Sequence, residues 1–353
     1  MGTTNLSNTE LLLQVKDLRT YFFLDEGTVK AVDGADLEIR SCQTLGVVGE
    51  SGCGKSVTAR SIMRILAKGG KIVNGEILFN RLLCHPEKGS IPSEMVDIID
   101  LTKLKPYSEE MRAIRGAEIS MVFQEPMTSL SPVHTIGNQI GEVISLHQKL
   151  DAKQTREKAI DVLDRVGMPL PSRTIDRYPH ELSGGMRQRA MIAMALSCHP
   201  SLLIADEPTT ALDVTTEAQI LTLMRQLQEE LGMSIMFITH NLGVIAQMAD
   251  QVVVMYLGKV VEDASVDALF HNPLHPYTQA LQQSIPRLGA KNIRNYRLAS
   301  IRGSVPDPYN LPKGCPFHPR CAHIIAGTCE VEEPKVVEVE PGHKVRCFLY
   351  SGS

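Results

Sequence analysis

Residues 47–58, which read VVGESGCGKSVT, place three glycines, a lysine and a serine directly after a run of aliphatic residues. The spacing of Gly49, Gly54, Lys55 and Ser56 matches G-x-x-x-x-G-K-[ST], a loop whose backbone N–H groups surround phosphates. Lys55 is expected to reach the terminal phosphates, and the Ser56 hydroxyl is expected to ligate Mg2+. The residues of this loop that are predicted to bind nucleotide are Gly49, Glu50, Ser51, Gly52, Cys53, Gly54, Lys55, Ser56 and Val57.

The segments on either side of this loop are those that a phosphate site requires. Leu45–Val48 reads as a short buried strand, and SVTARSIMRIL (residues 56–66) reads as a helix. The glycines allow the backbone to pass close to phosphates, and the helix N-terminus directs N–H groups and its dipole at negative charge. The context therefore favours a nucleoside triphosphate site over a glycine-rich turn without a ligand.

A pair of carboxylates follows a second apolar run. In SLLIADEP the predicted strand covers Leu202–Ala205 and ends at Asp206 and Glu207. Phosphoryl transfer to water needs one group that holds Mg2+ and another that orients the attacking water. Asp206 is predicted to hold the metal and Glu207 to act as the general base. The alternative is a pair of solvated residues at a strand end.

Two further apolar runs end in polar residues. Together, the apolar runs predict the sheet that positions the phosphate loop and the carboxylates. Ile119–Phe123 is followed by Gln124, and Ile235–Ile238 is followed by Thr239 and His240. Short apolar strands that alternate with helices predict a parallel sheet covered on both faces. Ligands of such sheets bind at the carboxyl ends of the strands, so these polar residues are expected near the phosphate loop. A lone histidine at such a position is usually structural, and only its companions favour a functional role.

Residues 178–197, YPHELSGGMRQRAMIAMALS, predict a second helix start that could bind an anion. Ser183 is a suitable N-cap, and Gly184 and Gly185 leave the N–H groups of the first turn open. Such a site makes sense if two domains of this kind meet and each serine-glycine turn closes over the nucleotide of the other.

Composition limits the class of protein. The 353 residues allow about two domains, and 43% hydrophobic with 22% charged residues is an ordinary globular mixture. A net charge of −4 argues against nucleic acid as the main partner. No stretch approaches the roughly 18 consecutive apolar residues that span a bilayer, and the N-terminus lacks the basic start and apolar core of a secretory signal. The chain is therefore expected in the cytosol, where eight cysteines favour metal binding or reduced thiols over disulfides.

Four cysteines lie together near the C-terminus, with the spacing C-x5-C-x7-C-x17-C: Cys315, Cys321, Cys329 and Cys347. Four thiolates suit zinc or an iron–sulfur cluster, and unligated thiols are the third interpretation. The surrounding tail is short and rich in proline and glycine, so it is expected to need a crosslink to stay folded.

Several of these motifs carry a family resemblance. LSGGM at Leu182–Met186 resembles the signature of ABC transporter ATP-binding subunits, and LLIADE resembles their Walker B strand. Gln124 resembles the Q-loop residue, TTALD ending at Asp213 the D-loop, and His240 the H-loop. In the LRTYF segment, Phe22, with Tyr21 as the alternative, matches the aromatic residue that stacks on adenine.

The resemblance implies a fold and a set of roles. The implied fold is α/β: a P-loop NTPase of the ABC nucleotide-binding type, with a parallel sheet core, an antiparallel β-subdomain and a helical subdomain, plus a small C-terminal cysteine-containing extension. The ATP-binding domain would cover 11–265, with the helical subdomain at about 125–185, and the extension would cover 266–353. The implied roles fall on three sets of residues: for catalysis Glu207, His240 and Gln124; for Mg2+ Ser56, Gln124 and Asp206; for the ATP of a partner subunit Ser183, Gly184, Gly185 and Gln188.

The resemblance is greatest to the oligopeptide and dipeptide permease branch of this family. The segments that carry it are QEPMTSLSPV, MYLGKVVE, NPLHPYTQAL and VPDPYNLPKGCPFHPRC. It implies the ATP-hydrolysing subunit of an importer that powers peptide uptake, with import of oligosaccharides or nickel as the alternative cargo and a non-transport ABC ATPase as a more distant one. The sequence departs from the branch in an apparent insertion at 85–97, in SLSPV, and in Asn241 after the histidine.

The branch also implies partners and a cofactor. Its ATPases work with a second, paralogous ATPase subunit and two transmembrane permease subunits on the cytoplasmic face of the membrane, and an extracytoplasmic protein binds the substrate. Because several of these ATPases carry a 4Fe–4S cluster in the C-terminal region, the resemblance favours a cluster on Cys315, Cys321, Cys329 and Cys347 over zinc.

Overall fold

The computed structural model describes residues 11–81, 97–125, 129–210, 212–284 and 301–351. The apparent insertion at 85–97 therefore lies outside the described residues, apart from its last position. The chain forms two compact units, each built from several segments. Unit 1 holds the described residues of Met1–Gln14, Glu38–Thr44 and Leu78–Ile238, and unit 2 holds those of Val15–Leu37, Leu45–Ile77 and Thr239–Ser353.

The strands of unit 1 form the parallel arrangement that the sequence predicts. Their order is β8 (Ser234–Thr239), β7 (Leu202–Asp206) and β6 (Ile119–Val122), and both neighbouring pairs are parallel. Every residue of these strands is buried, which is why they read as continuous apolar runs. The predicted strands lie within one residue of the observed ends.

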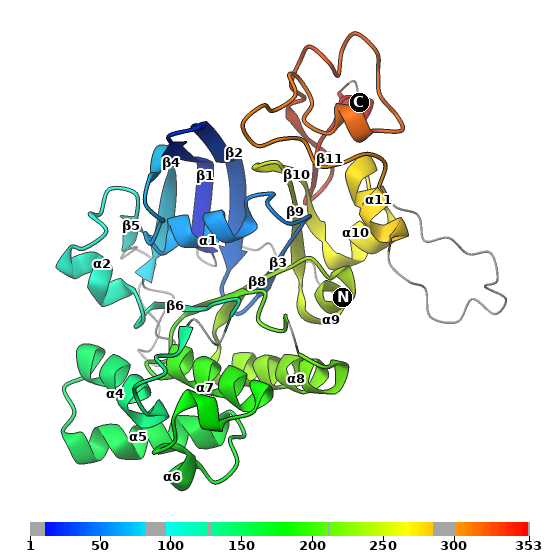
Figure 1. Cartoon of the computed structure of the whole chain (residues 1–353). Coiled ribbons are helices and arrows are strands. Elements are labelled where there is room, and N and C mark those ends of the chain that lie inside the picture. The colour runs from blue at the N-terminus through cyan, green and yellow to red at the C-terminus, as the bar shows by residue number, and fades with distance from the viewer. Residues whose placement is uncertain (1–10, 82–96, 126–128, 211, 285–300, 352–353) are drawn as a thin grey trace, which may run out of the picture. The chain divides into compact units, whose positions relative to one another are not determined.

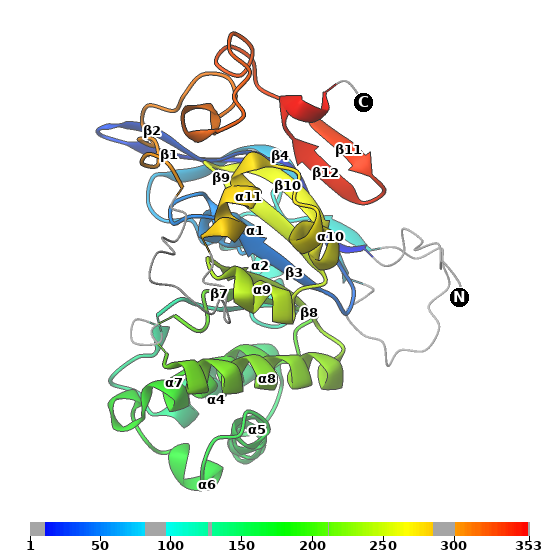
Figure 2. The same cartoon turned by 90° about the vertical axis from the view of Figure 1, so that its right-hand side faces the viewer.

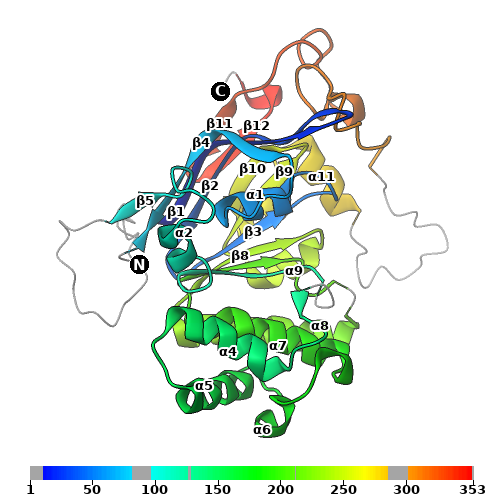
Figure 3. The same ribbon diagram turned by 60° about the vertical axis from the view of Figure 1, so that its left-hand side comes forward.

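The helices of unit 1 include a bundle in which α4, α5 and α7 pack together (Figure 3). Between Ile136 and Val166 the chain forms two helices, α4 and α5. The second begins because Asp151 accepts from the Gln154 amide and the Gln154 side chain accepts from the Asp151 amide, which completes a capping box. The helices of unit 1 are α2 (Glu109–Ile114), α4 (Ile136–His147), α5 (Ala152–Arg165), α6 (Pro171–Thr174), α7 (Gly184–Leu196) and α8 (Val214–Leu231), with a 3-10 turn η3 (Pro179–Glu181).

Unit 2 holds a mixed set of strands in the order β11-β12-β10-β9-β3. β3 pairs with β9 in parallel, whereas β9, β10, β12 and β11 pair in an antiparallel way. The strands are β3 (Thr44–Val48), β9 (Gln251–Tyr256), β10 (Lys259–Ser265), β11 (Val336–Glu340) and β12 (His343–Arg346). Figures 1 and 2 show α10 and α11 beside β10. The helices are α1 (Lys55–Ile62), α9 (Leu242–Met248), α10 (Val266–His271) and α11 (Pro276–Gln283), with 3-10 turns η4 (His318–Arg320) and η5 (Phe348–Tyr350).

A second sheet has the order β2-β1-β4-β5. β1 (Leu11–Leu24) and β2 (Gly27–Arg40) form a hairpin across a two-residue turn, and β4 (Gly70–Asn80) pairs with β5 (Ile98–Asp100) in an antiparallel way. The long alternation of buried and more exposed residues along β1 and β2 is typical of a sheet with one covered face. None of the helices in the described part of the chain is long and apolar enough to cross a lipid bilayer.

The C-terminal extension is held by ordinary packing. β12 adds to the edge of β10, so the extension continues the sheet. Tyr256, Tyr277 and Phe317 form a buried aromatic cluster with ring centroids 4.7–5.3 Å apart. A smaller apolar cluster joins Leu274, Val345 and Cys347. The tail was expected to need a crosslink to stay folded, but these contacts bury apolar side chains of the tail.

Candidate nucleotide-binding site

The phosphate loop has a backbone that requires its glycines. Gly49 has φ of 152°, and a Cβ added there would lie 2.2 Å from the Met255 carbonyl oxygen. Gly54 has φ of 103°, and a Cβ there would lie 2.4 Å from the Ala31 carbonyl oxygen. Any side chain at either position would therefore displace backbone, and the loop keeps its close path only with glycine.

Lys55 lies inside this loop with 5% of its surface exposed. Its Nζ donates to the carbonyl oxygens of Gly49 at 2.7 Å and Glu50 at 3.1 Å. Gly54 is the N-cap of α1, so no side chain caps this helix, and Ser56 lies in its first turn. The ammonium group thus holds the loop curved around itself, which is the arrangement that a polyphosphate needs.

Glu50 is fixed by two residues that the sequence motifs did not identify. Its amide donates to the Tyr277 hydroxyl at 2.8 Å, and its carboxylate accepts from Arg320 Nη1 at 2.6 Å and Nη2 at 3.0 Å. Both partners lie in the C-terminal extension, more than 200 positions further along the chain. Tyr277 lies in the segment NPLHPYTQAL and Arg320 in CPFHPRC. The sequence analysis used both segments as markers of the family, and the second also for its cysteines, but it gave neither Tyr277 nor Arg320 a role.

Cys53 is buried within the phosphate loop. Burial raises the pKa of its thiol, and its Sγ lies 3.9 Å from Lys55 Nζ. A neutral thiol here fills space and carries no charge. This agrees with Cys53 contributing to the loop through its backbone.

The predicted base lies at a strained position of the chain. Asp206 is the last residue of β7 and is 1% exposed, whereas Glu207 follows it with φ of 47°, in the left-handed region. The Glu207 amide donates to the Ile238 carbonyl at 2.9 Å, and this hydrogen bond fixes the turn. Left-handed conformations of non-glycine residues cost free energy and are concentrated at functional sites.

The Glu207 carboxylate is bonded to two neighbours. Its Oε2 accepts from Gln124 Nε2 at 3.1 Å and from Thr210 Oγ1 at 3.0 Å. The structure therefore brings together two of the three predicted catalytic residues, and it adds Thr210, which the sequence did not suggest. His240, the third, is exposed directly after β8, and Asn241 begins α9 by accepting from the Gly243 amide.

The serine-glycine turn begins α7 as predicted. Ser183 is the N-cap, its hydroxyl accepts from the Met186 amide at 3.3 Å, and both Ser183 and Gly184 are exposed. Asp213 caps α8 by accepting from the Thr216 amide and hydroxyl. Gln188 differs from the others, since it is 2% exposed and its Nε2 has no hydrogen-bond partner within the described residues.

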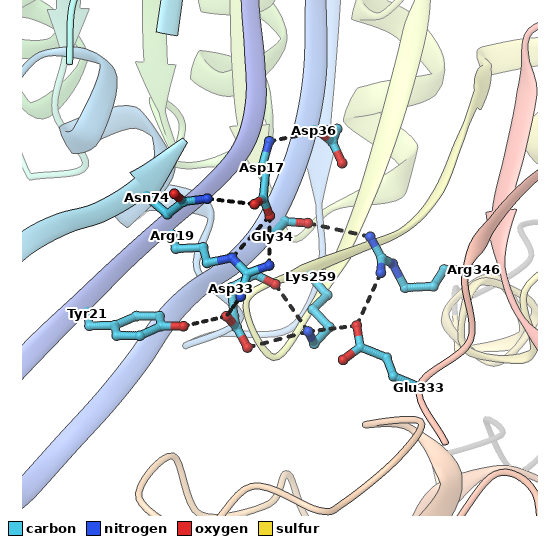
Figure 4. A network of polar contacts seen from close by, with 10 residues as sticks. All are labelled: Asp17, Arg19, Tyr21, Asp33, Gly34, Asp36, Asn74, Lys259, Glu333 and Arg346. Carbon is cyan, nitrogen blue, oxygen red and sulfur yellow. Dashed lines mark hydrogen bonds and ion pairs between the residues drawn. The ribbon is translucent and has the colours of Figure 1, made fainter. Parts of the chain in front are cut away.

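The two aromatic candidates for adenine stacking lie next to each other on β1 and have different contacts. The Tyr21 hydroxyl donates to Asp33 Oδ1 at 2.6 Å (Figure 4). Lys30 Nζ lies 5.6 Å from the centroid of the Tyr21 ring. Phe22 packs beside Gly70, where an added Cβ would lie 2.8 Å from its ring. Burial and the hydrogen bond to Asp33 raise the pKa of Tyr21, so its hydroxyl remains a donor.

Figure 4 shows that the network around Tyr21 extends to the C-terminal extension. Lys259 Nζ lies 3.4 Å from the Asp33 carboxylate and 2.8 Å from that of Glu333. Glu333 also pairs with Arg346 at 3.1 Å. Burial alone would raise the pKa of Asp33, but the Tyr21 hydrogen bond and the charge of Lys259 lower it overall, so this carboxylate stays ionised.

The prediction of a metal centre in the tail is wrong. Among the residues that the structure describes, which include all four tail cysteines, no group of three or more His, Cys, Asp or Glu side chains is arranged to hold a metal ion. The iron–sulfur cluster, its zinc alternative and the ligand roles of Cys315, Cys321, Cys329 and Cys347 are therefore not supported.

Burial gives the physical reason for this correction. It raises the pKa of Cys315 and of Cys347 to about 11 and also raises that of Cys321, so these thiols stay protonated near neutral pH. Metals bind thiolates, which this environment disfavours. Cys347 instead packs with Leu274 and Val345, and the Cys315 amide donates to the Cys329 carbonyl. Cys315, Cys329 and Cys347 thus act as small buried residues of the tail, and Cys321 is half-buried.

Comparison with known proteins assigns the family. Residues 32–210 match the model described as "ABC transporter", and residues 261–329 match "Oligopeptide/dipeptide transporter, C-terminal region". The chain is 48% identical over 340 residues to the oligopeptide transport ATP-binding protein AppD of Bacillus subtilis, covering 96% of this chain and 97% of that protein. It is 47% identical to the probable peptide ABC transporter ATP-binding protein y4tR of Sinorhizobium fredii, covering 96% of this chain and 95% of that protein.

Solved structures agree on the fold. The ATP-binding cassette MJ0796, in a dimeric post-hydrolysis state bound to ADP and Pi, superposes with a TM-score of 0.61 at 24% identity, covering 72% of this chain and 99% of that chain. The class of protein is thus an ABC-type ATP-binding domain with the predicted α/β architecture, and this prediction is confirmed. More narrowly, the chain belongs to the ABC transporter family and carries the C-terminal region of its oligopeptide/dipeptide branch.

Proposed function

We propose that this chain is the ATP-hydrolysing subunit of an ABC importer that takes up di- or oligopeptides. The observation that carries the proposal is the presence, in one chain, of a phosphate loop with an ammonium group at its centre and a C-terminal region of the oligopeptide/dipeptide type. The peptide ATP-binding proteins named above are similar over nearly the whole chain, which supports peptide as the cargo.

The phosphate loop and the base have separate tasks in this function. Lys55 and the backbone N–H groups of the phosphate loop, apart from that of Glu50, bind and orient the ATP phosphates. Glu207 orients the attacking water and takes its proton, and its bonds to Gln124 and Thr210 fix the carboxylate in direction. Phe22 stacks on adenine, since Tyr21 is already committed to Asp33 and Lys30. His240 completes the catalytic set.

Mg2+ fits the chemistry of the proposed donor set. Ser56, Gln124 and Asp206 offer a hydroxyl, an amide and a carboxylate oxygen, and Mg2+ prefers oxygen ligands of this kind. When bound, the ion neutralises charge on the ATP phosphates. Asp206 is buried at the end of β7. A buried carboxylate needs a cation or hydrogen-bond donors as compensation.

The exposed serine-glycine turn supports a second ATPase subunit as a partner of this chain. Ser183, Gly184 and Gly185 begin a helix whose N-terminus can bind phosphates of ATP held by another ATPase subunit, and Asp213 caps the next helix beside this turn. That second subunit is a paralogue, and the pair acts at the cytoplasmic face of two transmembrane permease subunits. An extracytoplasmic substrate-binding protein delivers the peptide. Residues 11–265 form the ATP-binding part and residues 266–353 the extension.

The test is peptide uptake by the reconstituted transporter. Proteoliposomes that contain this chain, its partner ATPase and the two permease subunits should take up labelled di- or oligopeptide in the presence of ATP and the substrate-binding protein. The same vesicles with Glu207→Gln in this chain should bind ATP and fail to accumulate peptide. Uptake of an oligosaccharide or Ni2+ but no peptide would contradict the proposed cargo.

A further inference from the structure

The phosphate loop and the C-terminal extension meet at Glu50, and each polar group of Glu50 is bonded within the protein. Its N–H donates to the Tyr277 hydroxyl, and its carbonyl accepts from Lys55 Nζ. Its carboxylate accepts two hydrogen bonds from the Arg320 guanidinium, at 2.6 Å and 3.0 Å. Glu50 is thus the residue through which the protein holds the loop.

We infer that Arg320 and Tyr277 are positioning residues, through which the C-terminal extension fixes the phosphate loop in its ATP-binding shape. The inference rests on the proposed function, because it assumes that this loop binds the phosphates of ATP. Neither residue needs to touch the nucleotide. Both act on Glu50, and Glu50 is continuous with the backbone that surrounds the phosphates.

The charge of Arg320 has a second consequence for the loop. Glu50 places a carboxylate within a loop that must receive a polyanion, and like charges at short range repel. The Arg320 guanidinium forms a bidentate ion pair with that carboxylate, and its side chain is only 4% exposed. Salt screens such a partly buried pair much less than it screens surface charges. Arg320 therefore neutralises Glu50 at the place where its charge would oppose ATP.

Arg320 is itself held firmly by the extension. Its Nε donates to the Arg302 carbonyl at 3.0 Å, and its Nη1 lies 3.3 Å from the Tyr256 hydroxyl. Its guanidinium carbon lies 5.8 Å from the Tyr256 ring centroid, and Tyr256 packs against Tyr277 and Phe317. One aromatic cluster thus supports both groups that hold Glu50, so folding of the extension and shape of the loop are coupled.

The experiment is a charge cycle measured on the full-length chain. Equilibrium binding of a fluorescent ATP analogue with Mg2+ is compared for wild type, Arg320→Met, Glu50→Gln and the double variant. Arg320→Met should weaken binding about tenfold, because it leaves a partly buried carboxylate unpaired beside the phosphates. Glu50→Gln should weaken binding about threefold, because the amide oxygen still accepts from Arg320 but the ion pair is lost. The double variant should bind better than Arg320→Met, because no unpaired charge remains, but worse than Glu50→Gln, because the hold of Arg320 on the loop is lost; a merely structural role of Arg320 does not produce this partial rescue.

Tyr277→Phe tests the second contact without a change of charge. It should weaken binding about threefold, the size expected for one neutral hydrogen bond. In the assembled transporter Arg320→Met and Tyr277→Phe should raise KM for ATP more than they lower kcat. Arg320→Lys should fall between wild type and Arg320→Met, because it keeps the charge and loses the bidentate geometry.

Matched controls remove equivalent groups elsewhere. Arg156→Met breaks a bidentate pair with Asp176 that includes no residue of the phosphate loop, and Tyr350→Phe deletes a hydroxyl bonded to the Leu274 carbonyl. Both should bind the analogue like wild type. The inference is overturned if Arg320→Met and Tyr277→Phe bind no worse than these controls, or if the double variant binds as poorly as Arg320→Met. Failure of the wild-type chain to bind would instead contradict the proposed function. If Arg320→Met does not fold, Tyr277→Phe and Glu50→Gln still decide the matter.

Discussion

Two helices of this chain begin at glycine-containing turns, and the two turns are held in different ways. At the start of α1, Lys55 is buried inside the phosphate loop, and Glu50 of the same loop is bonded to Tyr277 and Arg320. At the start of α7, Ser183 caps its own helix, and the exposed Ser183 and Gly184 face solvent. The first turn is preorganised by its own chain. The second is a surface that another molecule can complete.

The largest effect is expected from a variant that removes the general base and leaves the phosphate loop unchanged. Glu207→Gln should lower kcat of the assembled transporter at least about a hundredfold, which is the usual contribution of a general base. Binding of the ATP analogue should stay close to wild type, because Lys55 and the loop are unchanged. Steady-state ATP hydrolysis and equilibrium binding provide the two numbers.

A neighbouring variant is the control for this prediction. Thr210→Val removes the hydrogen bond that Thr210 donates to the Glu207 carboxylate and should lower kcat by only about tenfold. Near-normal hydrolysis by Glu207→Gln would show that another group is the base.

Low pH should destabilise the C-terminal extension, which holds the phosphate loop. Burial lowers the pKa of His275 to about 4 from an ordinary value near 6.5, although the charge of Glu262 opposes the shift. Because the unfolded chain binds this proton more readily, the stability from neutral His275 is complete above about pH 6.5 and is lost as pH falls toward 4. The loss amounts to at most about 3 kcal/mol, since one pKa unit corresponds to about 1.4 kcal/mol.

The measurement is thermal unfolding between pH 7.5 and 4.5, followed together with binding of the ATP analogue. His275→Gln should be less stable than wild type at pH 7.5, and its unfolding temperature should fall less between pH 6.5 and 4.5. Equal pH dependence in the two proteins would remove His275 as the cause.

A pair of glycines tests the second turn. A Cβ at Gly185 would lie 2.8 Å from Thr216 Cγ2, whereas a Cβ at Gly184 would have Leu212 Cδ2, at 4.0 Å, as its nearest neighbour. Gly185→Ala should therefore lower the free energy of unfolding by about 1 kcal/mol through overpacking. Gly184→Ala should leave stability within about 0.5 kcal/mol of wild type, as a surface substitution does. Denaturant unfolding of the two variants checks this, and equal stabilities would contradict the packing difference.

The contrast between the two turns also explains what could be predicted from the sequence. Gly49, Gly54 and Lys55, and likewise Ser183, depend on spacing within one strand–loop–helix or one helix start, so local patterns identified them. Three buried strands were located within a residue because buried parallel strands leave continuous apolar runs. The capping box at Asp151, which begins α5, was not identified from the sequence.

The contacts that fix the loop from outside could not be predicted in this way. Arg320 and Glu50 are 270 positions apart, and nothing in either segment states that they pair. The tail cysteines led to the opposite error. Four thiols within 33 residues of the tail suggested a metal. Their spacing does not show whether a thiol is a buried neutral group, as burial makes Cys315 and Cys347.

The most direct test of the central claim compares one variant from each turn in two assays. The claim is that this chain holds its own ATP at the phosphate loop and offers its serine-glycine turn to the ATP of another subunit. Lys55→Ala should abolish binding of the ATP analogue by the isolated chain. Ser183→Arg should bind the analogue like wild type when isolated, yet lower ATP turnover of the assembled transporter at least about tenfold, because a bulky side chain occupies the site meant for phosphates. Loss of binding by isolated Ser183→Arg to the same extent as by Lys55→Ala would contradict the account, as would unchanged turnover of its assembled transporter.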